Sequence, residues 1–97
     1  MNITYANPTL QRLRCQRRFH ADLPLDVVAE YRVVIQYIEV AVDQGDLHIA
    51  WLGFRVLDDQ GGVHAMRLTD TSRLICEVRR DAIVIYGIET WTQEVDA

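Results

Sequence analysis

The stretch from residue 63 to residue 91 constrains the fold most, because it contains three segments rich in apolar and β-branched residues. The segments are residues 63–68, 73–79 and 82–91. The first break between them, residues 69–72, reads Thr-Asp-Thr-Ser, and such side chains hydrogen-bond their own backbone in turns. The second break is the short turn Arg80-Asp81. Connections this short join antiparallel neighbours, so we predict a β-meander.

The middle segment has one apolar side and one polar side. Side chains alternate between the two sides of a strand. Leu74, Cys76 and Val78 therefore share one side, and the other side carries Arg73, Ile75, Glu77 and Arg79. This pattern is typical of a sheet that has helices on one side and a polar surface on the other.

Two helices are predicted before the meander. Asn7 and Pro8 are a good helix start, because Asn suits the N-cap and Pro suits the first helical position. We expect the first helix over residues 8–19. A second helix is predicted from Pro24, with apolar residues at helical spacing and an αL cap near Gly45. The short linker predicts that these two helices form an antiparallel hairpin with its apolar stripe on the sheet.

Two further strands complete the predicted fold. Residues 2–6 have alternating apolar positions, and residues 54–57 precede a hairpin loop into the meander. The order β, α, α and then four strands predicts one α+β domain of two layers over residues 1–97. A chain of 97 residues supplies one modest hydrophobic core.

Composition narrows the classes of function. The net charge is −4, all ten cationic residues are Arg, and residues 1–21 carry four of these without an acid. A domain-wide basic surface is absent, so basic patches are expected only on the first helix or on the polar side of the sheet. Cys15 and Cys76 lie far apart without histidines at ligand spacing, so we expect two free thiols, with a disulfide as the alternative, and no metal or cofactor. With no apolar run of roughly 20 residues and no signal-peptide pattern, we expect a cytoplasmic protein that does not enter a membrane.

Several short motifs share an order along the chain. The opening reads ITYANPTLQRL, a connector over residues 41–47 contains Asp-Leu, residues 62–68 read GVHAMRL, and RLI follows at 73–75. The last predicted strand closes with IETW at residues 88–91. In this order and spacing, the chain resembles the toxins of type II toxin–antitoxin systems, the RelE/ParE superfamily and especially its HigB-like branch.

The resemblance implies a RelE-like fold and an inhibitor of translation that cleaves messenger RNA on the ribosome and is neutralised by a cognate antitoxin protein. The implied reaction is a metal-independent attack of a ribose 2′-hydroxyl on the adjacent phosphate. It requires cations to stabilise the phosphorane and groups that move protons. Arg67 and Arg73 match family arginines that bind phosphate or frame the site, and a guanidinium can contact two phosphate oxygens at once.

The other candidate site residues follow from their predicted positions. Glu89, on the side of Ile85 and Gly87, and His64 are the candidates for proton transfer. His64 lies three residues before Arg67, so the two face opposite sides unless a bulge intervenes. The candidate RNA-binding residues are Arg55, Arg79 and Trp91. For each candidate a structural role is the alternative, such as an Arg67–Glu77 ion pair, and Tyr86 is assigned to the core by its alternation with Val84 and Ile88.

Three departures from the family pattern leave other functions open. Asp58-Asp59 stands where the family has a basic residue, Arg55 stands near the position of a family histidine, and Trp91-Thr92 replaces a closing tyrosine–histidine pair. One alternative is a catalytically degenerate binding module, which binds an antitoxin or resembles a gyrase poison. The other is a small structural or regulatory homodimer.

Overall fold

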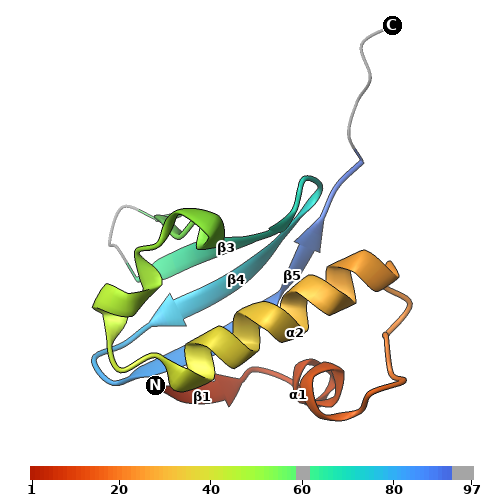
Figure 1. Cartoon of the computed structure of the whole chain (residues 1–97), viewed down its shortest axis with the longest axis horizontal. Coiled ribbons are helices and arrows are strands. Elements are labelled where there is room, and N and C mark those ends of the chain that lie inside the picture. Colours follow the sequence, from red (N-terminus) through yellow and green to blue (C-terminus); the bar gives the residue numbers. More distant parts are fainter. Residues whose placement is uncertain (59–61, 93–97) are drawn as a thin grey trace, which may run out of the picture.

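The computed structural model describes residues 1–58 and 62–92, which form two helices and one five-stranded sheet. The elements are β1 (Asn2–Tyr5), α1 (Pro8–Cys15), α2 (Leu25–Val40), β2 (Arg55–Val56), β3 (Val63–Thr69), β4 (Ser72–Val78) and β5 (Ala82–Thr90). Two short 3-10 turns, Gln44–Leu47 and Ala50–Leu52, connect α2 to β2. The predicted α+β class is confirmed (Figure 1).

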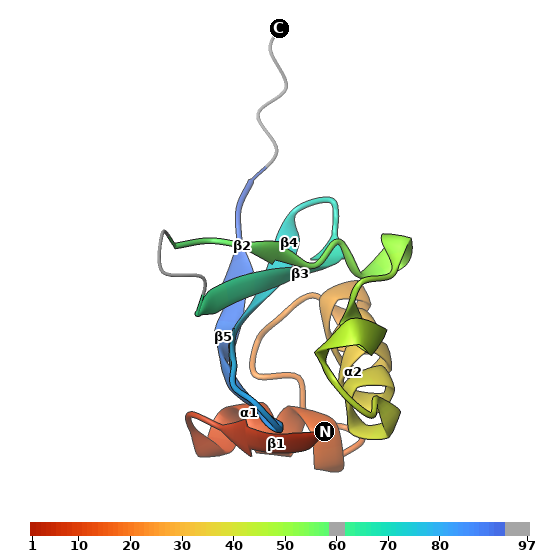
Figure 2. The same cartoon turned by 90° about the vertical axis from the view of Figure 1, so that its left-hand side faces the viewer.

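The strands lie in the order β1-β5-β4-β3-β2. The predicted meander is confirmed, because β2 to β5 pair as antiparallel neighbours and the ends of β3, β4 and β5 lie within one residue of the predicted ends. β1 pairs in parallel with β5 and makes the sheet mixed. Figure 2 shows α2 on one side of β3, β4 and β5, with no helix over their other side. We call these the inner and the outer side of the sheet.

The core lies between α2 and the inner side of the sheet. The buried stripe of α2 has the predicted helical spacing and consists of Val27, Val28, Tyr31, Val34, Ile35 and Ile38. The buried residues that the strands contribute are Met66, Leu68, Leu74, Cys76, Ile83 and Ile85. Each such fully buried side chain stabilises the fold by about 1.5–3 kcal/mol relative to an exposed one.

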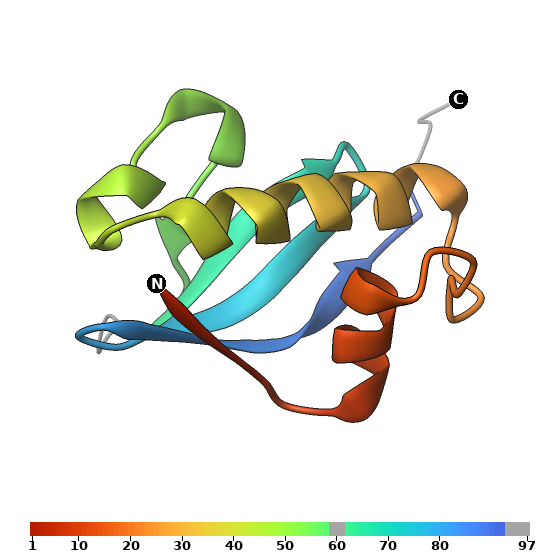
Figure 3. The same cartoon turned by 60° about the horizontal axis from the view of Figure 1, so that its bottom comes forward.

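A residue of α2 completes the end of α1. α1 ends at Cys15, earlier than predicted, because Gln16 adopts an extended conformation. The Arg32 guanidinium donates hydrogen bonds to the carbonyl oxygens of Leu13 (2.8 Å), Gln16 (3.0 Å) and Phe19 (3.1 Å). Helix ends leave such carbonyls without partners, so α2 supplies the missing donors. α1 lies across the direction of α2 (Figure 3), and the expected antiparallel helix hairpin is not the arrangement observed.

The end of α2 also differs from the prediction. α2 ends at Val40, and the next residue, Ala41, is extended (φ −64°, ψ 137°). Gly45 lies inside a 3-10 turn, where its N–H donates to the Asp43 carboxylate at 2.8 Å. The αL cap predicted at Gly45 is therefore wrong. Among the glycines that the structure describes, the one with a left-handed conformation is Gly53 (φ 57°).

A β-bulge in β5 changes which side chains face the core. Ile75 of β4 pairs with Gly87, whereas the next residue, Cys76, pairs with Ile85, so Tyr86 is the extra residue. Ile85 is buried, while Tyr86 is 42% exposed on the outer side. The assignment of Tyr86 to the core is wrong because it assumed strict alternation. For the same reason, Glu89 pairs with Arg73 on the outer side and does not share the side of Ile85.

In the described part of the chain, no helix has both the length and the apolar character needed to cross a bilayer.

The buried thiol of Cys76 predicts a dependence of stability on pH. Burial raises the pKa of this thiol to about 12, whereas an unfolded cysteine ionises near about pH 8.5. The folded chain therefore keeps a proton that the unfolded chain loses, and the stabilisation is complete below about pH 8.5 and is lost as the pH rises toward 12. We expect urea denaturation to show a smaller fall in unfolding free energy between about pH 8 and pH 11 for Cys76→Val than for the wild type.

Cys15 provides the matched control, because its side chain is exposed. Cys15→Ser should follow the pH profile of the wild type. If the unfolding free energy falls equally with pH in the wild type and in both variants, the role given to Cys76 is contradicted.

Candidate functional site

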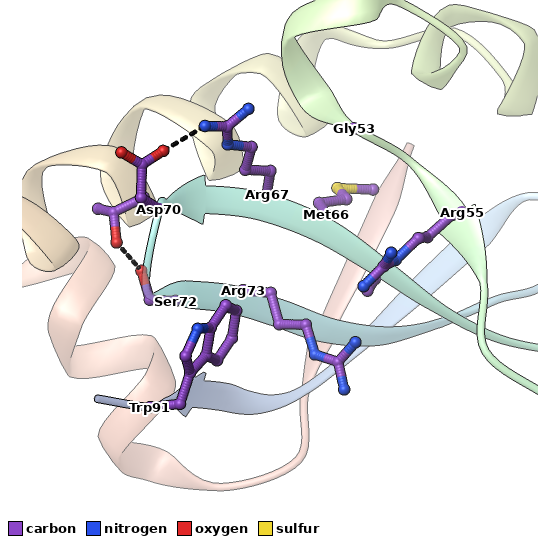
Figure 4. Close-up of a pocket in the computed structure, with 10 residues that line it drawn as sticks. Gly53, Arg55, Met66, Arg67, Asp70, Ser72, Arg73 and Trp91 are labelled. Atoms are coloured by element: carbon purple, nitrogen blue, oxygen red, sulfur yellow. Dashed lines mark hydrogen bonds and ion pairs between the residues drawn. The ribbon is translucent and has the colours of Figure 1, made fainter. Parts of the chain in front are cut away.

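An open pocket of about 400 Å³ lies on the outer side of the sheet, where β2, β3, β4 and the residue after β5 meet. Its charged and aromatic lining residues are Arg55, Arg67, Asp70, Arg73 and Trp91 (Figure 4). Gly53, Ala65, Met66, Thr69 and Ser72 complete the lining. Four of the seven residues predicted for the site thus lie around one pocket.

Strand pairing brings the three arginines together. Arg67 and Arg73 are direct partners across β3 and β4. Arg55 pairs with Ala65 across β2 and β3, and Ala65 has the same alternation as Arg67. Like charges placed opposite each other on neighbouring strands are destabilising on their own. The pairing of Arg67 with Arg73 therefore needs nearby anions.

Two carboxylates supply part of the negative charge that the pairing of Arg67 with Arg73 needs. Asp70, in the turn between β3 and β4, accepts a hydrogen bond from the Arg67 guanidinium, and Glu89 of β5 accepts one from Arg73 at 2.9 Å. Within residues 1–58 and 62–92, Arg55 makes no ion pair, and the buried Nε of Arg73 has no hydrogen-bond partner. The pocket thus retains an excess of positive charge. Both ion pairs have exposed members, so each contributes little to stability.

Gly53 gives the Arg67 side chain its space, and sequence reasoning missed it. A Cβ atom at this position would lie 3.1 Å from the Cβ of Arg67. Its φ of 57° is also one that residues with a side chain rarely adopt. The sequence signal was a lone glycine next to Phe54, just before a predicted strand.

Trp91 forms one wall of the pocket. Its backbone N–H donates to the Thr71 carbonyl at 3.0 Å, which extends the contact of the β5 end with the neighbouring turn. The side chain is 45% exposed, and the centre of its ring lies 6.0 Å from the guanidinium carbon of Arg73. The pocket therefore combines cationic donors with a flat apolar surface.

Three predicted residues do not line the pocket, and of these Glu89 contacts a lining residue through its ion pair with Arg73. His64 is buried on the inner side, where its ring stacks on Phe54 with centres 4.5 Å apart and Nδ1 lies 3.1 Å from the Gly62 carbonyl oxygen. These contacts agree with the structural alternative for His64. Arg79 follows β4 and contacts Glu77 instead of the pocket. The ion pair considered between Arg67 and Glu77 is not formed, because each has another partner.

Tyr86, Glu77 and Arg79 form a second polar group on the outer side, which we call the Tyr86 cluster. The Tyr86 hydroxyl donates to Oε2 of Glu77 at 2.8 Å, and Arg79 donates to the same oxygen from Nε (3.2 Å) and from one terminal nitrogen (2.9 Å). The hydrogen bond from Tyr86, followed by that from Arg79, lowers the pKa of Glu77. The same hydrogen bond raises the pKa of the Tyr86 hydroxyl. Sequence reasoning missed this cluster because it grouped Tyr86 with Ile88, although the lone glycine between them, Gly87, is a signal for a bulge.

The chemistry available in the pocket is the binding of an anion next to a planar group. Guanidinium groups donate hydrogen bonds to phosphate or carboxylate oxygens, and Trp91 offers a surface for stacking. Among residues 1–58 and 62–92, no three side chains of His, Cys, Asp or Glu gather to hold a metal ion.

Comparison of the chain with protein-family models gives no match. A search of curated proteins also finds no matching sequence. The functional inference therefore depends on the pocket and its residues.

Gly53 gives a test of how the pocket is built. We expect Gly53→Ala to lower the free energy of unfolding by about 1 kcal/mol or more, because the new Cβ meets Arg67 and the backbone is left-handed. Urea denaturation checks this value. Gly87→Ala is the matched control, since nothing lies within 4 Å of a Cβ at Gly87. Equal effects of the two substitutions would contradict the role of Gly53.

Proposed function

We propose that this chain is a toxin of the RelE/HigB-like type that binds single-stranded RNA in the outer pocket and cleaves messenger RNA. The observation that carries the proposal is the pairing of Arg67 with Arg73 in one pocket beside Trp91. A phosphodiester supplies an anion for the guanidinium groups that these two paired residues carry, and its base supplies a partner for the indole ring. The motifs at residues 62–68 and 73–75, which resemble those of the toxin family, contain these same two arginines.

The proposed reaction needs no metal ion. The ribose 2′-oxygen attacks the adjacent phosphorus, the bond to the 5′-oxygen breaks, and the products are a 2′,3′-cyclic phosphate and a 5′-hydroxyl. Arg67 and Arg73 stabilise the charge that develops on the phosphorane oxygens. Glu89, which contacts Arg73 at 2.9 Å, accepts the proton from the 2′-hydroxyl, and water protonates the leaving oxygen. The proposal places this activity in the cytoplasm and includes an antitoxin protein that neutralises it.

A second candidate function is RNA or antitoxin binding without cleavage. The observation that favours it is that the residues lining the pocket include no histidine, tyrosine or lysine. In addition, the Glu89 carboxylate already has a partner, because Arg73 contacts it at 2.9 Å. The two candidates share the binding step and differ in the chemistry that follows.

Cleavage of a labelled RNA by the purified protein, with a chelator present, tests the proposal. We expect Arg67→Ala combined with Arg73→Ala to abolish both RNA binding and cleavage, because both phosphate-binding groups are lost. Glu89→Gln should keep binding within a few-fold and reduce cleavage by about a hundredfold or more. Arg17→Ala removes the same charge from an exposed site outside the pocket and is the control.

The same variants expressed in cells complete the test. The wild type should arrest growth and fragment messenger RNA, and the variant lacking both pocket arginines should do neither while remaining folded. Binding that depends on Arg67 and Arg73 without any cleavage would favour the second candidate. A folded wild type that neither binds RNA nor affects growth would overturn the proposal.

A further inference from the structure

The Tyr86 cluster lies on the same side of the sheet as the pocket. Glu77 and Arg73 are four residues apart on β4, and residues at this spacing share a side. A strand rises about 3.3 Å per residue, so the two positions are about 13 Å apart. Between them lies the pair formed by Ile75 and Gly87. Gly87 has no side chain, and a Cβ placed there would meet no atom within 4 Å. Gly87 therefore adds no side chain to the surface between the pocket and the cluster.

The guanidinium of Arg79 is held in a way that leaves part of it free. Nε and one terminal nitrogen contact the same oxygen of Glu77, which occupies one edge of the planar group. The Arg79 side chain is 63% exposed. A guanidinium has five N–H donors, so the opposite edge can still bind a phosphate oxygen. Glu77 thus acts as a positioning residue for Arg79.

The Tyr86 ring is similarly held by one end. Its hydroxyl donates to Glu77, while the side chain stays substantially exposed. An aromatic ring with a fixed hydroxyl loses little conformational freedom when a base stacks on it.

We propose that Tyr86, Glu77 and Arg79 form a second nucleotide subsite, which binds the same single-stranded RNA that the pocket binds. Tyr86 stacks on a base and Arg79 contacts a neighbouring phosphate. The inference rests on the proposed function, because it takes the pocket as the first subsite. A separation of about 13 Å corresponds to about four nucleotides if the bases stack at about 3.4 Å each, and to fewer if the strand is extended. A chain of about two nucleotides, which has a single phosphodiester step, therefore does not reach from the pocket to the cluster, whereas a longer chain does.

The test compares two lengths of fluorescent, non-cleavable 2′-O-methyl RNA, about two and about twelve nucleotides long, by fluorescence anisotropy at one salt concentration. We expect Tyr86→Ala and Arg79→Ala each to weaken binding of the longer chain by about tenfold and to change binding of the shorter chain by less than about twofold. Tyr86→Phe keeps the ring, so it should weaken binding of the longer chain less than Tyr86→Ala does. Arg80→Ala removes the same charge one residue away, in the turn before β5, and is the matched control.

Binding of the short chain also shows that each variant is folded. If Tyr86→Ala and Arg79→Ala bind the longer chain as tightly as the wild type, while loss of Arg67 and Arg73 abolishes binding, the second subsite is wrong and the proposed function stands. Equal losses of affinity for the longer chain in Arg79→Ala and Arg80→Ala would also overturn the second subsite. Binding would then depend on the net charge of the protein and not on the position of Arg79. A wild type that binds neither chain would overturn both proposals.

Discussion

The pairing of β5 with β4, with its bulge at Tyr86, is the constraint on which both the core and the outer surface depend. Strict alternation would place Ile83 and Ile85 on one side of the strand and Ile88 on the other. The bulge lets all three contribute to the core, with Ile83 and Ile85 fully buried and Ile88 partly buried against the same cluster. As a result, Glu89 faces outward, on the same side as Tyr86. One irregular residue thus decides which side chains are available to a ligand.

The outer side shows how an acidic chain presents a local positive surface. Asp70, Glu77 and Glu89 each contact one arginine of the outer side, and they come from a turn, a central strand and the end of the last strand. Each carboxylate reduces the repulsion between neighbouring arginines in the folded chain. These pairs are exposed at least in part, so they orient guanidinium groups more than they stabilise the fold. A phosphate that enters can contact the donors that the carboxylates leave free.

Local patterns predicted most of the elements, and contacts between elements decided what was missed. The start of α1 at Pro8, the buried stripe of α2 and the three long strands follow from capping and periodicity, which neighbouring residues determine. Arg67 and Arg73 were named through the resemblance to the toxin family, and the strand pairing places them on one side of the sheet. The left-handed glycine at 53, the crossing of the two helices and the position of Tyr86 depend on tertiary packing. The likeness to the RelE/HigB toxins remains a prediction.

For the proposed RNA ligand, the outer side suits a single strand better than a duplex. The net charge of −4 gives no long-range attraction for a polyanion, so affinity must come from short-range contacts. Trp91 and Tyr86 each expose close to half of their side-chain surface on this side. Bases in a duplex are already stacked and paired, whereas bases of a single strand are free to stack on aromatic rings. Together with the arginines of the outer side, these rings favour an unpaired strand over a duplex as the proposed ligand.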